Sequence, residues 1–561
     1  MKPASLITIV LAVVAVVVAA VIASGGGGKA KPGSQGRATV TAPPGSQRLS
    51  FVVSPEKEQL LRAVVAKFNA SKTQANGKPV FVSMDAMNSG DAESAIARGR
   101  LKPDVWSPAG SFWGRLLNLQ SDKPYVANDS PSIVRTPLVI AMWEPMAQAL
   151  GYPRKQVSFD QIVRLATDPR GWAAVGKPAF GRFKYVHTNP DSSTSGAEAV
   201  TGSYYALAGK KEGLTDADVA KAAPRVKDLE RSIVHYGDST LFIEDQLCRG
   251  GLAYASAVAM EETTVIAFNR RRCSNTRLVA LYPREGSFVS DSPYIVLNAD
   301  WVTPADRAAA GAFQRFLAKE VSADLAGRYG FRPGDPEAKP AGLVSAAAGA
   351  DPAQPRRELS LPEPTVLNRV LTTWRRDRKP ARVMLVLDNS GSMQEEDKLD
   401  HAKQGLAAFF RAVAPQDEIG LTKFSSHVKQ LVAPAPFATN RAALLGALKD
   451  IIPEDNTTVY DATIDAVDAI KQGADADHIN AVVVLTDGAD TSSGHSSREV
   501  LDRLTEEGHA ESNGVRVFTI AYGSDARASE LQRFAEASGG TAFVASTTDI
   551  EQVYRSISSF F

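Results

Sequence analysis

The most constraining feature of the sequence is an apolar run of strand length, Val383 to Leu387, that ends abruptly in Asp388. A second apolar run, Ala481 to Leu485, is followed two residues later by Asp487. Strands that are apolar at nearly every position are typical of parallel sheets with helices on both faces, because neither face meets water. We therefore predict an α/β fold with a doubly wound, mostly parallel sheet for residues 379–561.

Segments with helical periodicity alternate with the predicted strands of this region. We expect strands at residues 383–388, 418–424, 427–432, 481–487, 515–521 and 541–545. We expect helices at residues 397–412, 441–451, 460–472, 497–507, 528–537 and 550–560.

Polar side chains follow the first of these strands, at the edge where α/β sheets bind ligands. Asp388, Ser390 and Ser392 offer a carboxylate and two hydroxyls, the hard oxygen ligands that Mg²⁺ or Ca²⁺ prefers. Helix N-capping is the alternative role, because Asp and Ser are common N-cap residues. No Gly-Lys-Ser/Thr follows, which excludes a P-loop. No glycine stands two residues before Ser390, which excludes a G-x-S-x-G nucleophile elbow.

The segment Asp388-Asn389-Ser390-Gly391-Ser392 resembles the metal-ion-dependent adhesion site of von Willebrand factor type A (VWA) domains. That family adds a threonine from a later loop and an aspartate after another buried strand. The segment 455–462 is similar to the threonine loop, although Asn456 stands where the family usually has glycine, and 480–488 is similar to the strand end. The resemblance implies a site for Mg²⁺, with Ca²⁺ or Mn²⁺ as alternatives, formed by Asp388, Ser390, Ser392, Thr457 and Asp487.

Predicted strands and helices also alternate over residues 48–335. Four short segments follow one another along this region: 103–106 (Pro-Asp-Val-Trp), 193–196 (Ser-Thr-Ser-Gly), 282–286 (Tyr-Pro-Arg-Glu-Gly) and 330–333 (Gly-Phe-Arg-Pro). Together they resemble the type 2 periplasmic solute-binding proteins of ABC transporters. That resemblance implies a two-lobed solute-binding fold with a ligand cleft between its lobes.

In such a cleft, helix N-termini present unpaired N–H groups that can bind a small oxyanion or another small molecule. N-capping is the alternative role for each candidate residue, and a lobe pair kept only as a scaffold is the alternative for the whole cleft. The candidate ligand-binding residues are Asn88, Ser89, Ser107, Ser192, Ser193, Thr194 and Ser195.

Residues 1–23 contain Lys2 and an apolar run, Leu6 to Ala23, that is interrupted only by Thr8. A run of this length can just cross a bilayer. We therefore predict a signal anchor in the cell membrane, with the N-terminus cytoplasmic and the bulk of the chain extracytoplasmic. Cleavage of the signal, which would give a secreted protein, is the alternative. Residues 24–47, rich in Gly, Ser, Pro and Lys, are predicted to form a flexible linker.

An exported chain meets an oxidising environment, in which disulfide bonds persist. We therefore expect the two cysteines, Cys248 and Cys273, to form a disulfide bond. Two buried thiols are the alternative. Residues 336–378 are predicted to be a linker that ends in a short amphipathic helix at 365–378.

The formal net charge of +1 gives no support for a nucleic-acid-binding surface. No motif pairs a nucleophile with a positioned base, so we do not expect an enzyme. We expect an exported, membrane-anchored binding protein in which the metal bridges to an acidic residue of a protein partner, coupled to the solute-binding-like domain. A solute receptor of an ABC-type importer and an extracytoplasmic assembly factor are the alternatives.

Overall fold

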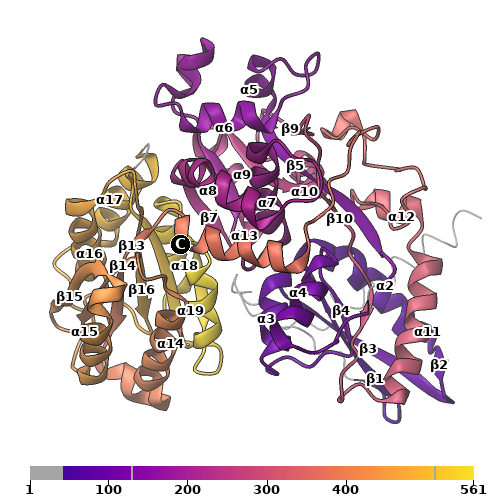
Figure 1. The fold of residues 1–561 in the computed structure, drawn as a ribbon. Helices are drawn as coiled ribbons and strands as arrows, with labels where there is room; N and C mark the ends of the chain where they lie inside the picture. The colour runs from indigo at the N-terminus through magenta and orange to yellow at the C-terminus, as the bar shows by residue number, and fades with distance from the viewer. Residues whose placement is uncertain (1–41, 128–129, 511–512) are drawn as a thin grey trace, which may run out of the picture. The chain divides into compact units, whose positions relative to one another are not determined.

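The computed structural model describes residues 42–127, 130–510 and 513–561 (Figure 1). It corrects the predicted single-pass membrane localisation: none of the helices in these ranges is long and apolar enough to cross a membrane. The longest of them, α11 (Pro304–Glu320), has 17 residues and carries charged side chains, whereas a span needs about 20 apolar residues. The predicted signal anchor, residues 1–23, lies outside the described residues.

The first sheet has the strand order β11-β4-β1-β3-β2, and β1 runs parallel to both β3 and β4. Helix α2 packs on it through Leu60, Leu61, Val64, Val65 and Phe68, the residues that helical spacing places on one face. We call this sheet and its helices lobe I. Its strands are β1 (Gln47–Val53), β2 (Gln74–Ala75), β3 (Lys78–Ala86), β4 (Val105–Ser107) and β11 (Ile295–Val296), and its helices are α2 (Glu58–Ser71), α3 (Ser89–Ala97), α4 (Phe112–Ser121), α11 and α12 (Ala323–Arg328).

The second sheet has the order β10-β5-β8-β6-β7, and β9 and β12 also pair with β5. We call this sheet and its helices lobe II. Its strands are β5 (Val134–Trp143), β6 (Tyr185–Thr188), β7 (Ile233–Gly237), β8 (Ala257–Glu261), β9 (Leu278–Leu281), β10 (Val289–Ser290) and β12 (Arg332–Pro333). Its helices are α5 (Glu144–Ala149), α6 (Phe159–Thr167), α7 (Thr194–Ala208), α8 (Asp216–Arg231), α9 (Thr240–Tyr254) and α10 (Glu262–Arg271). The predicted disulfide is confirmed: Cys248 of α9 is bonded to Cys273, just after α10.

The third sheet has the order β15-β14-β13-β16-β17-β18, and every pairing is parallel except that of β14 with β15. Its strands are β13 (Ala381–Asp388), β14 (Glu418–Phe424), β15 (Val428–Pro436), β16 (Ile479–Thr486), β17 (Arg516–Tyr522) and β18 (Ala542–Ala545). Its helices are α14 (Lys398–Ala412), α15 (Phe437–Asp450), α16 (Val459–Gly473), α17 (Ser497–His509), α18 (Ala528–Ala537) and α19 (Ile550–Ser558).

Both faces of the third sheet are covered, which confirms the predicted doubly wound fold. Val383, Leu385 and Leu387 of β13 pack into a core with α14, α15 and α19. The intervening Met384 and Val386 pack into a separate core with α16, α17 and α18. Successive side chains of a strand point to opposite faces, so the continuous apolar run supplies both cores.

Helix α13 (Pro364–Asp377) contacts both lobes. Its Leu367 and Leu371 share a hydrophobic cluster with Trp113 of α4 in lobe I. Its Trp374 is buried against lobe II, where the indole Nε1 donates a hydrogen bond of 2.8 Å to Glu230. The helix therefore ties the two lobes together immediately before the chain enters β13.

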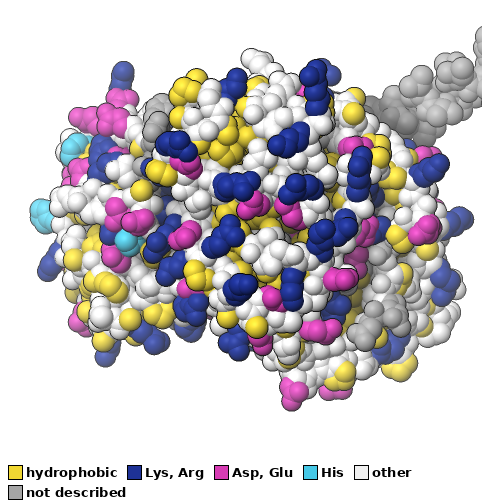
Figure 2. Space-filling view, turned by 45° about the horizontal axis from the view of Figure 1, so that its top comes forward, with side chains coloured by type: hydrophobic (Ala, Val, Ile, Leu, Met, Phe, Trp, Pro, Cys, Tyr) yellow, Lys and Arg dark blue, Asp and Glu magenta, His cyan; other side chains and the backbone are white. Residues whose placement is uncertain are grey.

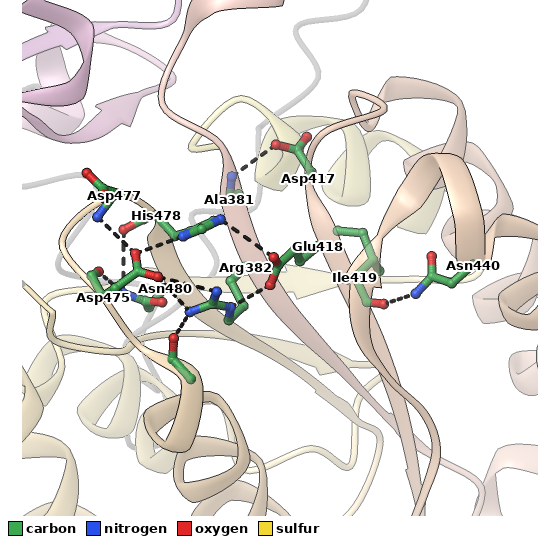
Figure 3. A network of polar contacts seen from close by, with 11 residues as sticks. Ala381, Arg382, Asp417, Glu418, Ile419, Asn440, Asp475, Asp477, His478 and Asn480 are labelled. Atoms are coloured by element: carbon green, nitrogen blue, oxygen red, sulfur yellow. Dashed lines mark hydrogen bonds and ion pairs between the residues drawn. The ribbon is translucent and has the colours of Figure 1, made fainter. Parts of the chain in front are cut away.

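Polar contacts tie the starting ends of β13 and β14 to the loop before β16 (Figure 3). The Nε of Arg382 donates a hydrogen bond of 2.6 Å to Glu418, and the same guanidinium lies 3.4 Å from Asp475. His478 Nδ1 lies 2.8 Å from Asp475 Oδ1. These contacts hold the loop 475–478 against the strand ends.

Charged side chains of both signs cover the face of the molecule shown in Figure 2. Lys and Arg side chains are frequent there, and Asp and Glu side chains lie between them. Neither sign of charge forms a broad uniform patch on this face.

We expect Trp374→Ala to lower the free energy of unfolding by about 3–5 kcal/mol, the usual cost of truncating a large buried aromatic side chain. Chemical denaturation of the full chain, followed by circular dichroism, measures this change. Arg369→Ala is the matched control, because Arg369 is an exposed residue of the same helix. Equal effects of the two substitutions would contradict the structural role of Trp374.

Candidate metal centre and solute cleft

The carboxylates predicted to bind metal lie at one edge of the third sheet. Asp388 ends β13, and Asp487 follows β16, its parallel neighbour. Asp388 Oδ1 accepts a hydrogen bond of 2.8 Å from the Ser390 backbone N–H, and its Oδ2 accepts one of 2.6 Å from the Thr486 hydroxyl. These two bonds orient the carboxylate without any contribution from an ion.

The two predicted serine ligands connect the carboxylates to each other. The Ser390 and Ser392 hydroxyl oxygens are 3.2 Å apart, and the Ser392 hydroxyl donates a hydrogen bond of 2.7 Å to Asp487 Oδ1. Asp388, Ser390, Ser392 and Asp487 therefore form a continuous polar chain across the sheet edge.

The predicted threonine ligand comes from the loop before α16. A Cβ atom placed on Gly488 would lie 3.8 Å from the Thr457 hydroxyl oxygen and 3.9 Å from that of Ser392. Both hydroxyls thus lie close to the same backbone position. Asn456, at the position where VWA domains usually have glycine, has a φ of 53°. Asparagine tolerates this left-handed conformation better than most residues. The loop can therefore keep this backbone conformation although Asn456 replaces the family's usual glycine.

The structure adds Lys398, a residue that the sequence analysis did not identify. Its Nζ lies 2.8 Å from Asp487 Oδ2, and its side chain is buried. Burial by itself would lower the pKa of Lys398, but the hydrogen bond and the charge of Asp487 raise it above its ordinary value. No spacing signal marks Lys398 in the sequence, because it reaches the site only through the placement of α14.

The donor set fits a hard divalent cation. Two carboxylates and three hydroxyls supply oxygen ligands only, which is the preference of Mg²⁺. Burial raises the pKa of Asp388 to about 6, and the nearby charge of Asp487 adds a smaller contribution in the same direction. In the described part of the chain, no cluster of three or more His, Cys, Asp or Glu side chains is arranged to hold a metal. A site built mainly from hydroxyls does not depend on such a cluster.

Four of the seven predicted solute-binding residues line a small cavity between the lobes, and its volume of about 20 Å³ has room for about one water molecule. These four are Asn88, Ser89, Ser193 and Thr194. The other three do not line it: the Ser192 hydroxyl donates to Asp91, the Ser195 hydroxyl is 2.9 Å from that of Thr188, and Ser107 is fully buried.

Hydrogen bonds between the lobes hold this cleft closed. The Gly90 N–H of lobe I donates to the Ser192 carbonyl of lobe II at 2.9 Å, and Trp113 Nε1 donates to the Thr194 hydroxyl at 2.8 Å. A Cβ atom on Gly90 would lie only 1.9 Å from the Asp191 carbonyl oxygen, so this approach requires glycine.

The lining of the closed cleft is acidic. Glu56 and Glu261 contribute carboxylates, and burial raises the pKa of Glu261 to about 7. Among the described residues that line this cavity there is no Lys or Arg. A bound oxyanion, as predicted from the sequence, would therefore depend on N–H and hydroxyl donors alone.

Comparison with protein families identifies both parts of the chain. Residues 49–332 match the model of the bacterial extracellular solute-binding protein family, and residues 383–556 match the model of the von Willebrand factor type A domain. The two predicted resemblances are thereby confirmed.

Two uncharacterized proteins, from the strains CDC 1551 / Oshkosh and H37Rv of Mycobacterium tuberculosis, are each 23% identical to this chain over 453 residues. The match covers 78% of this chain, which spans only 65% of the length of these relatives.

Two solved structures are similar to parts of this chain. A von Willebrand factor type A protein of Catenulispora acidiphila is 17% identical, covers 32% of this chain and 42% of its own, and has a TM-score of 0.29. The periplasmic binding protein AfuA of Actinobacillus pleuropneumoniae is 14% identical, covers 60% of this chain and 99% of its own, and has a TM-score of 0.43. At these values the similarities support no conclusion about this chain. On the family matches, the chain belongs to the bacterial extracellular solute-binding proteins and carries a von Willebrand factor type A domain after the solute-binding region.

Proposed function

We propose that this chain is a non-enzymatic binding protein whose VWA domain captures an acidic residue of a protein partner through a bound divalent cation, with Mg²⁺ as the expected ion. The observation that carries the proposal is the meeting of five oxygen-bearing side chains at one edge of the third sheet: Asp388, Ser390, Ser392, Thr457 and Asp487.

The charge balance of the site favours a ligand from a partner. Asp388 and Asp487 are the two acidic members of the donor set, and Lys398 offsets part of the charge of Asp487. The hydroxyls add oxygen ligands without adding charge. When bound, the cation would supply an electrophilic centre with a free coordination position, which a partner carboxylate can fill.

We further propose that the solute-binding region is coupled to this domain through α13. A solute larger than a water molecule requires the cleft to open, which breaks the Gly90–Ser192 and Trp113–Thr194 hydrogen bonds. Opening also moves α4 relative to α7, and α13 contacts both helices. Because only three residues separate the end of α13 from the start of β13, a change at the cleft acts on the strand that ends in Asp388.

We expect Asp388→Ala to abolish binding of Mg²⁺, because it removes a donor that two hydrogen bonds hold in place. Calorimetric titration of Mg²⁺, Ca²⁺ and Mn²⁺ into the purified full chain measures the affinity and shows which ion is preferred. Asp400→Ala is the control, because Asp400 is an exposed carboxylate of α14 that lies outside the site. Unchanged binding in Asp388→Ala would contradict the metal site.

We expect Lys398→Met to strengthen Mg²⁺ binding by about tenfold, since loss of the ammonium leaves Asp487 with its full charge for the ion; tenfold corresponds to about 1.4 kcal/mol. The same calorimetric titration tests this prediction, with Lys403→Met of the same helix as the control. Equal or weaker binding in Lys398→Met would show that the lysine does not oppose the ion.

Capture of a partner should depend on the ion. We expect affinity-tagged full chain to retain a protein partner in Mg²⁺ and to release it in EDTA, and we expect the Asp388→Ala chain to retain none. The readout is the set of proteins eluted after the tagged chain is incubated with an extract of the cells that produce it. A partner that stays bound in EDTA and binds Asp388→Ala equally would refute metal bridging, even if calorimetry finds the ion.

A further inference from the structure

A second cavity, of about 380 Å³, lies at the starting ends of the VWA strands, far along the sheet from the metal site. Lobe II contributes the ends of α6 and α8 and the start of β7. The VWA domain contributes Lys379, residues 476–480 and the start of β17. A cavity of this volume falls within the usual range of small-molecule sites.

The lining of this cavity carries more positively charged than negatively charged side chains. Five cations line it: Arg182, Lys184, Arg231, Lys379 and Arg516. Four acids also line it, but Asp168 pairs with Arg170, and Glu507 pairs with Lys471 and Arg503, all of which lie outside the lining. Asp228 and Asp477 remain. Without Lys184, whose Nζ donates to the Ala253 carbonyl at 2.8 Å, the four cations Arg182, Arg231, Lys379 and Arg516 still outnumber these two acids.

Two of the cations are held in place by hydrogen bonds to backbone carbonyls. Lys379 is only 5% exposed, and its Nζ donates to the Ile233 carbonyl at 3.1 Å. Arg516 donates from Nη1 to the Gly539 carbonyl at 2.9 Å. Among the described residues, no carboxylate forms an ion pair with either. Buried charges in proteins are normally paired, and here burial lowers the pKa of Lys379 to about 8 and lowers that of Arg516 as well.

Residues 476–480 form one wall of the cavity, and contacts on the side away from the cavity hold this segment in place. The network of Arg382, Glu418, Asp475 and His478 anchors it to the strand ends (Figure 3). Asn480 lines the cavity, and its Oδ1 is buried with no hydrogen-bond partner among the described protein atoms. Asn480 Oδ1 can only accept a hydrogen bond, so its partner would be a hydroxyl group of the ligand or a water molecule, and not the anionic oxygens themselves.

We propose that this cavity binds a small oxyanion, a phosphate- or carboxylate-bearing metabolite, with the buried Lys379 and the partly buried Arg516 as the anchors and Arg182 and Arg231 at the rim. Such a ligand would contact lobe II and the VWA domain together, because Arg231 ends α8 whereas Arg516 begins β17. It would therefore stabilise their contact. This site is separate from the solute cleft and from the metal centre.

Calorimetric titration and thermal unfolding of the full chain test the proposal, with inorganic pyrophosphate and citrate as the probes and EDTA present to remove metal. We expect saturable binding and a higher Tm with at least one probe. Binding of pyrophosphate alone assigns phosphate ligands to the site, and binding of citrate alone assigns carboxylates. Binding of neither probe overturns the proposal.

Variants show whether binding occurs in this cavity. We expect Lys379→Met to weaken binding at least tenfold. Because that variant changes a buried residue, the double variant Arg182→Gln/Arg231→Gln gives a second test at exposed positions and should weaken binding several-fold. Arg225→Gln, an exposed arginine of α8 outside the lining, should bind as the unaltered chain does, and so should Asp388→Ala. Equal affinity in the rim variant and in Arg225→Gln would overturn the proposal.

Discussion

The parallel pairing of β13 with β16 is the constraint on which the candidate metal centre depends. In this register Leu387 lies opposite Leu485, so both strands end at the same level. The Thr486 hydroxyl then reaches Asp388, and the Ser392 hydroxyl reaches Asp487. A shift of one residue would turn the side chains of a strand to the opposite face. It would separate the carboxylates and expose one apolar core, so packing and site geometry depend on the same register.

Three polar sites of different electrostatic character lie in the folded chain. The metal centre combines two carboxylates with neutral hydroxyls and one buried lysine. The solute cleft is lined by hydroxyls and two glutamates. The cavity between lobe II and the VWA domain is lined by the buried Lys379 and the partly buried Arg516, neither of which forms an ion pair with another described residue. Since a buried charge is costly unless an opposite charge meets it, we propose a different class of ligand for each site.

The order of strands and helices was predictable because their signals are local. The continuous apolar run Val383–Leu387 predicts a strand that is covered on both faces. The spacing of Leu60, Val64 and Phe68 predicts a helix that is buried on one face. The five metal-site residues could be named because they stand at strand ends and in loops that match a family pattern; binding of the ion itself stays a prediction. The disulfide between Cys248 and Cys273 followed from the even cysteine count in a chain expected to be exported. The membrane localisation drawn from residues 1–23 is the prediction that had to be corrected.

The sequence by itself determined the elements, the two family resemblances and the chemistry available at each strand end, because these depend on neighbouring residues. Only the tertiary structure decided which distant side chains meet. Lys398 pairs with Asp487 across 89 residues, and Trp374 of α13 donates to Glu230 across 144. Tertiary packing also closes the cleft around a space for one water molecule. It likewise brings Lys379, Arg231 and Arg516 together around one cavity. Such contacts follow from how whole elements pack, and no spacing along the chain encodes that packing.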